Sequence, residues 1–377
     1  MALSKDDVLA ALGKIPSPDG VPLPATGKLS EIIVADGKVF FSITVDSAAV
    51  QQWESVRERA QQAIRALPGV QSVMAALTAE RAGGAAPRPQ APPVGRARPG
   101  GPPGDPAAPG PAGIPGVQAI IAVASGKGGV GKSTTAVNLA LALRDLGLKV
   151  GILDADIYGP SMPKLLAIRE RPQTIGGNRL RPIERFGMPV MSIGFLIEEE
   201  TPMIWRGPMV MSALTQMLRE VEWGVLDVMV VDMPPGTGDA QLTMAQQVPL
   251  KGAVIVSTPQ DLALIDARRG IAMFRRVNVP VLGIVENMSM FICPHCGTRS
   301  DIFGHGGARR EAERLGVPFL GEVPLDIVIR EKSDSGTPVV ATVPDGVHAK
   351  FYRDIAMRVR DGLAATSRAA PKIVVEA

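Results

Sequence analysis

The feature that most constrains the fold is a glycine-rich stretch, GKGGVGKST, at residues 126–134. A Val/Ile/Ala-rich run, VQAIIAVAS, leads into it, and a helix-forming run, STTAVNLALALRDLG, continues from it. Together they match the pattern G-x-x-x-x-G-K-[ST] in the strand–loop–helix context in which this pattern binds phosphate. Because such a unit belongs to the α/β class, we expect an α/β domain built around a P-loop.

The residue types of this loop suit a nucleotide and its metal ion. Glycines let successive backbone N–H groups turn toward a phosphate, and the helix N-terminus adds its positive end. We expect Lys132 to reach the β- and γ-phosphates and the Ser133 hydroxyl to ligate Mg²⁺. The sequence therefore predicts ATP bound by Gly126, Lys127, Gly128, Gly129, Val130, Gly131, Lys132, Ser133 and Thr134.

Residues 117–366 alternate short apolar runs with helical stretches. The runs are rich in Val and Ile without a polar face, as in strands that are buried on both faces of a parallel sheet. We expect a doubly wound, mostly parallel sheet with helices on both faces. The expected strands lie in VQAIIAVAS, KVGILDAD, VMVVDMP, GAVIVSTP and PVLGIVENM.

Residues 82–116 consist almost entirely of Pro, Gly and Ala and show no apolar periodicity. Such a segment cannot bury enough surface to offset the entropy of ordering it, so we predict a disordered linker. It separates residues 1–81 from the P-loop domain at 117–366, which a short tail at 367–377 follows.

Residues 1–81 are expected to form a small α+β domain. Ser4 is a candidate N-cap for a first helix, and the turn 35–37 separates two β-rich runs, which suggests a hairpin. WESVRERAQQAIRAL reads as a second helix, and VQSVMAAL as a third strand.

Acidic residues stand at the ends of two apolar runs of the P-loop domain. LDADIYGPS carries Asp154 and Asp156, and VMVVDMPPGTGD carries Asp232 and Asp239. Ligands of open α/β sheets bind outside the carboxyl ends of the strands. We expect Asp232 to hold Mg²⁺ through water, whereas Asp154 and Asp239 either support the site or only cap turns.

The stretch SGKGGVGKST resembles the deviant Walker A motif of the SIMIBI class of P-loop ATPases, which includes nitrogenase iron protein, MinD and ParA. The resemblance implies that Lys127 crosses a homodimer interface to the partner's nucleotide, where it would act like an arginine finger. The alternative is a solvated loop lysine. The resemblance also assigns Asp156 to the attacking water, Gly236 to a loop that senses the γ-phosphate, and Asn287, Pro324 and Asp326 to the adenine pocket.

Further motifs resemble the Mrp/ApbC/NBP35 family across most of residues 117–345. The resemblance implies a slow, homodimeric ATP hydrolase that carries an iron–sulfur cluster, often [4Fe–4S], to apo-proteins and can receive it from scaffold proteins. Residues 1–81 resemble a MIP18-like (DUF59) domain, but Ala49 stands where that family often has a cysteine, which favours a docking role. The motifs of the P-loop domain are DADIYGPSMP, RGPM, DMPPGTGDAQL, STPQDLALIDARRG, ENMSMFICPHCG and IFGHGGA.

Cys293 and Cys296 are the only cysteines in the chain. Clusters and structural zinc both take four ligands, so a single C-x-x-C supplies half a site. Two chains about a two-fold axis would complete a bridging Cys₄ cluster site. The alternatives are an intrachain zinc site with His295 and His305, in which His295 points the wrong way, and a redox pair.

Charge and hydropathy limit the other functions. A net charge of +3 without a basic stripe gives no reason to expect nucleic-acid binding, and no run reaches the roughly 20 apolar residues of a membrane span. Cysteine usage and the absence of a secretory signal suggest the cytoplasm. The C-terminal helix is expected to pack on its domain rather than on a membrane. The main alternative function is a MinD- or ParA-like positioning ATPase with a structural zinc at the C-x-x-C.

Overall fold

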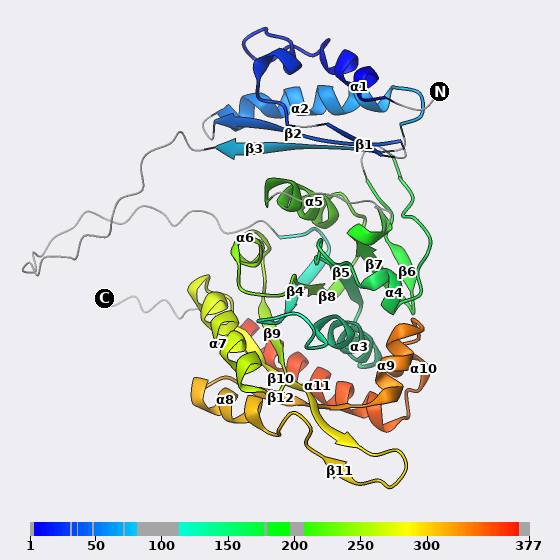
Figure 1. Ribbon diagram of the computed structural model, residues 1–377, viewed down its shortest axis with the longest axis vertical. Helices are drawn as coiled ribbons and strands as arrows, with labels where there is room; N and C mark the ends of the chain where they lie inside the picture. The colour runs from blue at the N-terminus through cyan, green and yellow to red at the C-terminus, as the bar shows by residue number, and fades with distance from the viewer. Residues whose placement is uncertain are drawn as a thin grey trace, which may run out of the picture. The chain divides into compact units, whose positions relative to one another are not determined.

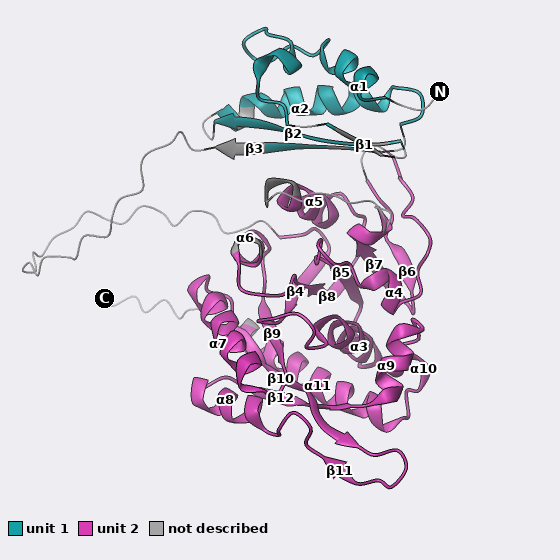
Figure 2. Ribbon diagram, viewed as in Figure 1, with its two compact units in different colours: residues 1–110 teal, residues 111–377 magenta. Residues whose placement is uncertain are grey.

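The structure is a computed structural model. It falls into two compact units, residues 1–110 and 111–377, which are described separately below (Figure 2). Of the predicted linker only residues 113–116 are described, and there Ile114 is buried. The described residues are 4–30, 32–35, 37–46, 49–70, 72–80, 113–176, 179–196 and 207–368.

Unit 1 is an α+β domain, as predicted (Figure 1). The capping box that Ser4 forms with Asp7 begins helix α1 (Lys5–Leu12). Strands β1 (Ile33–Ala35) and β2 (Lys38–Asp46) form the predicted hairpin, although Asp36 in its turn lies outside the described residues.

Helix α2 (Val50–Arg65) then crosses over to β3 (Ser72–Glu80), which pairs in parallel with β2. A short 3₁₀ turn, η1, spans Leu23–Thr26. Side chains from the helices and the sheet share one core, and Ala49 packs at its edge directly before α2. Large core members include Leu12, Leu23, Phe41, Ile43, Trp53 and Ile64.

Unit 2 is built on a mostly parallel sheet, which confirms the predicted α/β class. The described strands run in the order β11-β10-β9-β4-β8-β5-β7-β6, and β12 pairs in parallel with β10. The five predicted strands are present. The bounds are β4 (Val117–Ala124), β5 (Val150–Asp154), β6 (Ile183–Arg185), β7 (Met188–Ser192), β8 (Leu226–Asp232), β9 (Gly252–Ser257), β10 (Val281–Ile292), β11 (Arg299–Ser300) and β12 (Phe319–Leu325).

Helices cover both faces of this sheet (Figure 1). The chain moves in one direction across the sheet from β4 to β5, and in the opposite direction from β8 through β9 to β10. Because crossover connections between parallel strands are right-handed, the helices of these two sets of connections lie on opposite faces of the sheet. α3 and α11 pack together on one face, and α6, α7 and α8 follow one another on the other. The bounds are α3 (Lys132–Asp145), α4 (Met162–Leu165), η3 (Ile193–Phe195), α5 (Gly207–Arg219), α6 (Asp239–Gln247), α7 (Asp261–Arg276), α8 (Gly307–Leu315), α9 (Ile327–Asp334), α10 (Val339–Thr342) and α11 (Val347–Arg368).

The C-terminal helix packs on its own domain, as predicted. Tyr352, Ile355 and Val359 of α11 are each at most 1% exposed, and the helix contacts α3 and β12. None of the described helices has the length and apolar character needed to cross a membrane.

The strand order brings the predicted site residues to one edge of the sheet. β4 lies between β8 and β9, and β5 lies on the far side of β8. Asp154 at the end of β5 is the direct register partner of Asp232 at the end of β8. The loop after β4 therefore faces both acids across the carboxyl ends of parallel strands.

Candidate functional site

The loop at residues 125–131 connects β4 to α3 and forms the floor of a pocket of about 410 Å³. Gly129 and Gly131 adopt φ values of 81° and 80°, which residues other than glycine rarely adopt. The Ser125 hydroxyl donates to the Lys127 carbonyl at 2.8 Å and so closes the loop on itself. Lining residues include Gly128, Gly129, Lys132, Ser133, Asp156 and Pro160.

Two glycines of the loop are required by close packing. A Cβ on Gly126 would lie 2.2 Å from the backbone carbon of Asp266, so the loop rests directly on α7. A Cβ on Gly131 would lie 2.1 Å from the Asn287 side-chain nitrogen. These glycines therefore let two other segments approach the loop, in addition to exposing its N–H groups.

Lys132 lies between two carboxylates. Its ammonium is 2.6 Å from Asp232 Oδ1, 3.2 Å from the Ser133 hydroxyl and 3.6 Å from Asp156 Oδ2. All three charged side chains are almost completely buried. The structure thus brings together four residues that the sequence predicted for one site, and the lysine of the loop holds the acids in place.

The second oxygen of each carboxylate has no partner. Asp156 Oδ1 and Asp232 Oδ2 are buried and accept no hydrogen bond from the described residues. A buried carboxylate oxygen without a partner is costly, and hard divalent cations are bound by such oxygens. The chemistry of this donor set, together with the Ser133 hydroxyl, fits Mg²⁺.

Burial raises the pKa of all three acids at the strand ends. For Asp154, burial and the neighbouring Asp232 charge raise the pKa to about 7. Burial likewise raises the pKa values of Asp156 and Asp232, although Lys132 opposes the rise in both. One ammonium among three buried acids leaves an excess of negative charge, which a divalent cation would offset.

Asp154 serves to hold the loop after β5. Its two oxygens accept hydrogen bonds from the backbone N–H groups of Asp156, Ser161 and Met162 and from the Ser192 hydroxyl, at 2.9–3.2 Å. Because these donors occupy the carboxylate, the geometry favours a positioning role over support of Mg²⁺. Neither Ser161 nor Ser192 was predicted from the sequence, although Ser161 lies within the motif DADIYGPSMP.

The loop after β8 contacts the P-loop. The Gly236 N–H donates to the Ser125 carbonyl at 3.0 Å, with Gly236 at φ 99°, and Pro235 lines the pocket. Asp239 begins α6, but its side chain lies outside the described part of the structure. A group bound in the pocket can therefore bias this loop through Pro235 and Gly236.

Lys127 differs from Lys132 in its surroundings. It is partly exposed, is absent from the pocket lining, and forms no ion pair within the described part of the chain. Its backbone carbonyl is held by Ser125. Within the described residues the ammonium has no ion-pair partner, so it is available to a group from outside the chain.

Asn287, Pro324 and Asp326, which were predicted to contact adenine, differ in their surroundings. Asn287 lies against the P-loop and donates to the Val130 carbonyl at 2.8 Å. Pro324 is buried in β12, outside the pocket lining. Asp326 caps α9 by accepting from the Val328 N–H at 2.8 Å, and its other oxygen lies 3.0 Å from His348. Asn287 therefore lies against the loop, whereas the Asp326 carboxylate is already engaged elsewhere.

Cys293 and Cys296 lie at the tip of the hairpin that β10 and β11 form (Figure 1). The Cys293 N–H donates to the Thr298 carbonyl, and the Cys293 carbonyl accepts from the Gly297 N–H at 2.9 Å, which closes a tight turn around the two cysteines. Cys296 is exposed, and its sulfur lies within hydrogen-bond distance of the Thr298 hydroxyl, which lowers the pKa of the thiol because that hydroxyl can donate to the thiolate. Cys293 is partly exposed, so both thiols can be reached from solvent. A lowered pKa favours the thiolate form of Cys296, which is the form that binds metal.

The histidines do not complete this cysteine site within one chain. His305 contacts Ser289, Glu286 and Glu322 instead. In the residues that the structure describes, no third His, Cys or acid joins the two thiols to make a possible metal cluster. The geometry therefore offers no support for the intrachain zinc site.

Two family models match the chain. Residues 116–360 match a model described as NUBPL iron-transfer P-loop NTPase. Residues 5–75 match a model described as iron-sulfur cluster assembly protein. The two matches fall on the two compact units.

Individual relatives carry related names. The chain is 57% identical over 242 residues to the "iron-sulfur protein required for NADH dehydrogenase, mitochondrial" of Arabidopsis thaliana, covering 64% of this chain and 77% of the relative. It is 58% identical over 239 residues to the "iron-sulfur cluster transfer protein NUBPL" of Mus musculus, with 63% and 75% covered. For the "iron-sulfur cluster carrier protein" of Escherichia coli strain K12 the identity is 57% over 238 residues, with 63% and 64% covered.

A solved structure also shares the fold. It is a nucleotide-binding protein from Archaeoglobus fulgidus in complex with ADP. The two chains are 40% identical with a TM-score of 0.54, and the match covers 62% of this chain and 91% of that one. Unit 2 therefore shares its architecture with a protein that binds a nucleotide.

Proposed function

Because the chain belongs to the family of NUBPL iron-transfer P-loop NTPases, we propose that it is an iron–sulfur cluster carrier that binds and hydrolyses ATP. The observation that carries the proposal is the Cys293–Cys296 pair on the β10–β11 hairpin of a P-loop domain, in which Cys293 is partly exposed and Cys296 exposed. The cluster is the cargo, and apo-proteins that need it are the clients. The names of the relatives favour this function over a positioning ATPase.

We assign the nucleotide to the pocket over the loop at 125–131. The backbone N–H groups of the loop and the Lys132 ammonium hold the phosphates, and Ser133 and Asp232 hold Mg²⁺. When bound, Mg²⁺ neutralises charge on the phosphates. Asp156 orients the attacking water, because its carboxylate lines the pocket and keeps one buried oxygen without a partner.

The cluster site needs a second copy of the chain. Two thiolates from one chain supply two of the four protein ligands of a cluster, and a two-fold axis supplies an identical pair. The ammonium of Lys127 has no partner within its own described chain and would reach the nucleotide of that same second copy. One homodimer would thus complete a bridging [4Fe–4S] site and two ATPase sites.

Anaerobic reconstitution with iron and sulfide tests the cluster. The wild-type chain is expected to bind about two irons per chain, since one [4Fe–4S] cluster is shared by two chains. Cys293→Ser should lose the cluster and keep ADP binding. Ser300→Ala, on the return strand of the same hairpin, is the matched control and should keep both.

Transfer of the cluster to an apo-dehydratase, with and without Mg-ATP, then tests the carrier role. A colourless wild-type chain that holds only tight zinc would contradict the proposal. So would a cluster that remains bound in Cys293→Ser.

A further inference from the structure

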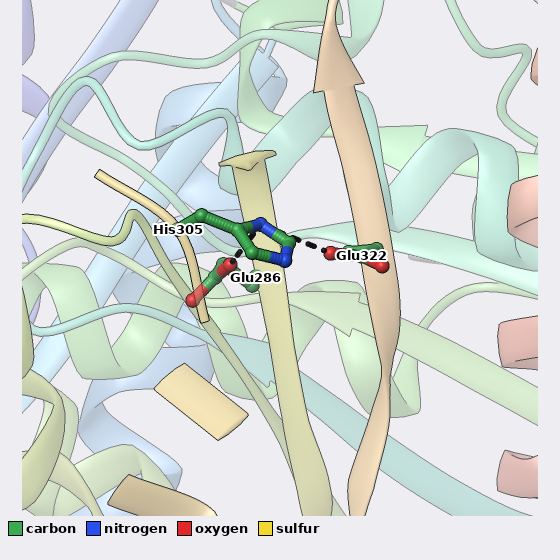
Figure 3. A group of neighbouring side chains, drawn as sticks. All are labelled: Glu286, His305 and Glu322. Carbon is green, nitrogen blue, oxygen red and sulfur yellow. Dashed lines mark ion pairs between the residues drawn. The ribbon is translucent and has the colours of Figure 1, made fainter. Parts of the chain in front are cut away.

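Glu286, His305 and Glu322 form a compact group at the base of the cysteine hairpin, outside both sites described above (Figure 3). Glu286 comes from β10 and Glu322 from β12, and His305 lies directly before α8. One ligand atom from each residue lies within 4.8 Å of the other two. We propose that this group is a site for a divalent transition-metal ion.

The distances suit direct ligation. His305 Nδ1 is 3.5 Å from Glu322 Oε2 and 3.9 Å from Glu286 Oε1. Ligands that each lie about 2.0–2.2 Å from a zinc ion are about 3.0–3.6 Å from one another. The first pair already fits this spacing, and the second requires a shift of a few tenths of an ångström.

The Ser289 hydroxyl can donate to only one of the two carboxylates beside it. This buried hydroxyl lies 2.6 Å from Glu286 Oε1 and 2.9 Å from Glu322 Oε2, and His305 Nδ1 is at 3.0 Å. A hydroxyl has one proton to donate, so it cannot satisfy two carboxylates at once. A cation on Glu322 and His305 leaves that proton to Glu286 and removes the conflict.

The charges also require a partner. Glu286 is fully buried, and the N–H groups of Gly306 and Ala308 hold its oxygens at the start of α8. Within the described residues, the basic side chain that pairs with both Glu286 and Glu322 is His305, which is charged only when protonated and then carries one charge against two; Arg310 contacts the His305 carbonyl. A divalent ion would neutralise the two carboxylates.

The donor set and the exposure indicate the class of ion. An imidazole with two carboxylates favours first-row transition metals such as Zn²⁺ or Fe²⁺ over Mg²⁺ and Ca²⁺. His305 and Glu322 are 35% and 27% exposed, so water can complete the coordination and the ion can enter. A bound ion would join β10, β12 and the segment before α8, and would fix the base from which the cysteine hairpin projects.

The test uses a full-length chain with Cys293→Ser and Cys296→Ser, so that no thiolate binds metal, and an excess of Mg-ADP to occupy the P-loop acids. Equilibrium dialysis against Zn²⁺ should give one ion per chain, and Zn²⁺ should raise the melting temperature. Adding His305→Gln or Glu322→Gln to this chain should weaken Zn²⁺ binding at least about tenfold. His295→Gln, which removes an exposed imidazole of the same hairpin, should leave it unchanged.

Two results would overturn the site. One is a cysteine-free chain that binds no Zn²⁺. The other is equal Zn²⁺ affinity in the Glu322→Gln and His295→Gln chains. Glu322→Gln keeps the shape of the side chain, so it decides the question even if His305→Gln does not fold.

Discussion

At the P-loop, three buried carboxylates and one ammonium share a small volume. Asp154 and Asp232 are paired in register on β5 and β8, and Lys132 lies between Asp232 and Asp156. Local sequence spacing predicted each of these residues near a phosphate site. It could not predict that Asp154 would be saturated by backbone N–H groups, because those donors depend on how the loop 156–162 folds back.

Asp154 should make stability depend on pH. Its pKa is about 7 in the folded chain against 3.8 as the ordinary value, so between these pH values the folded state holds a proton that the unfolded state has released. The free energy of unfolding should therefore fall as pH rises through this range, by at most about 4 kcal/mol. In Asp154→Asn the decrease should be smaller, because only Asp156 and Asp232 remain to titrate.

Urea unfolding measured from about pH 5 to about pH 8, without nucleotide or Mg²⁺, checks this prediction. Trp53→Phe in both chains restricts the fluorescence signal to unit 2. Equal slopes in the two chains would show that Asp154 does not titrate in this range.

Asp232→Asn should remove the benefit of Mg²⁺ for ADP binding. The substitution leaves one buried oxygen and removes the charge that faces the Ser133 hydroxyl and Lys132. Calorimetry should measure the ADP affinity of each chain with and without Mg²⁺. We expect the gain in affinity from Mg²⁺ to be at least about tenfold smaller in Asp232→Asn than in the wild type. The control is Asp227→Asn, which lies near the opposite end of β8 and accepts from the Lys149 N–H. A similar gain from Mg²⁺ in both variants would contradict the assignment.

At the scale of elements, apolar periodicity found the strands that are buried on both faces and missed those at the margins. β4, β5, β8, β9 and β10 all follow Val/Ile-rich runs. In contrast, β6, β7 and β12 are short or contain proline, as in MPVMS and FLGEVPL, and their pairing depends on neighbours that are distant in sequence. The Glu286, His305 and Glu322 group was missed for the same reason, because β12 brings Glu322 beside β10.

Gly126→Ala should destabilise unit 2 without touching a phosphate. The new methyl would lie 2.2 Å from the Asp266 backbone, so α7 or the loop must shift. Such overpacking lowers the free energy of unfolding by about 1–3 kcal/mol. Gly128→Ala in the same loop has nothing within 4 Å and should change stability by less than about 0.5 kcal/mol. Urea unfolding compares the two variants, and equal stability would show that the packing of α7 on the loop is loose.

For the whole molecule, two features of unit 2 are incomplete within one chain. The cysteine hairpin offers two thiols, and Lys127 has no ion-pair partner in the described residues. The sequence predicted the first feature from the number of cysteines and the second from the resemblance, and the geometry adds that Lys127 does not line its own pocket. Both features lead to the same expectation, that activity requires two copies.

Mixing two inactive variants tests whether Lys127 acts across the dimer. Under the proposed function, Lys127→Ala lacks the lysine that serves the partner, and Asp156→Asn lacks the carboxylate that serves its own nucleotide. In a mixed dimer the Lys127→Ala chain keeps its own Asp156 and receives Lys127 from the Asp156→Asn chain, so one site is complete. Random exchange makes half the dimers mixed, and ATPase activity should recover to about a quarter of the wild-type value. If Lys127 serves the nucleotide of its own chain, neither partner can repair the other and the mixture stays inactive. Because each variant alone provides the baseline, recovery above both baselines is the result that requires a lysine supplied in trans.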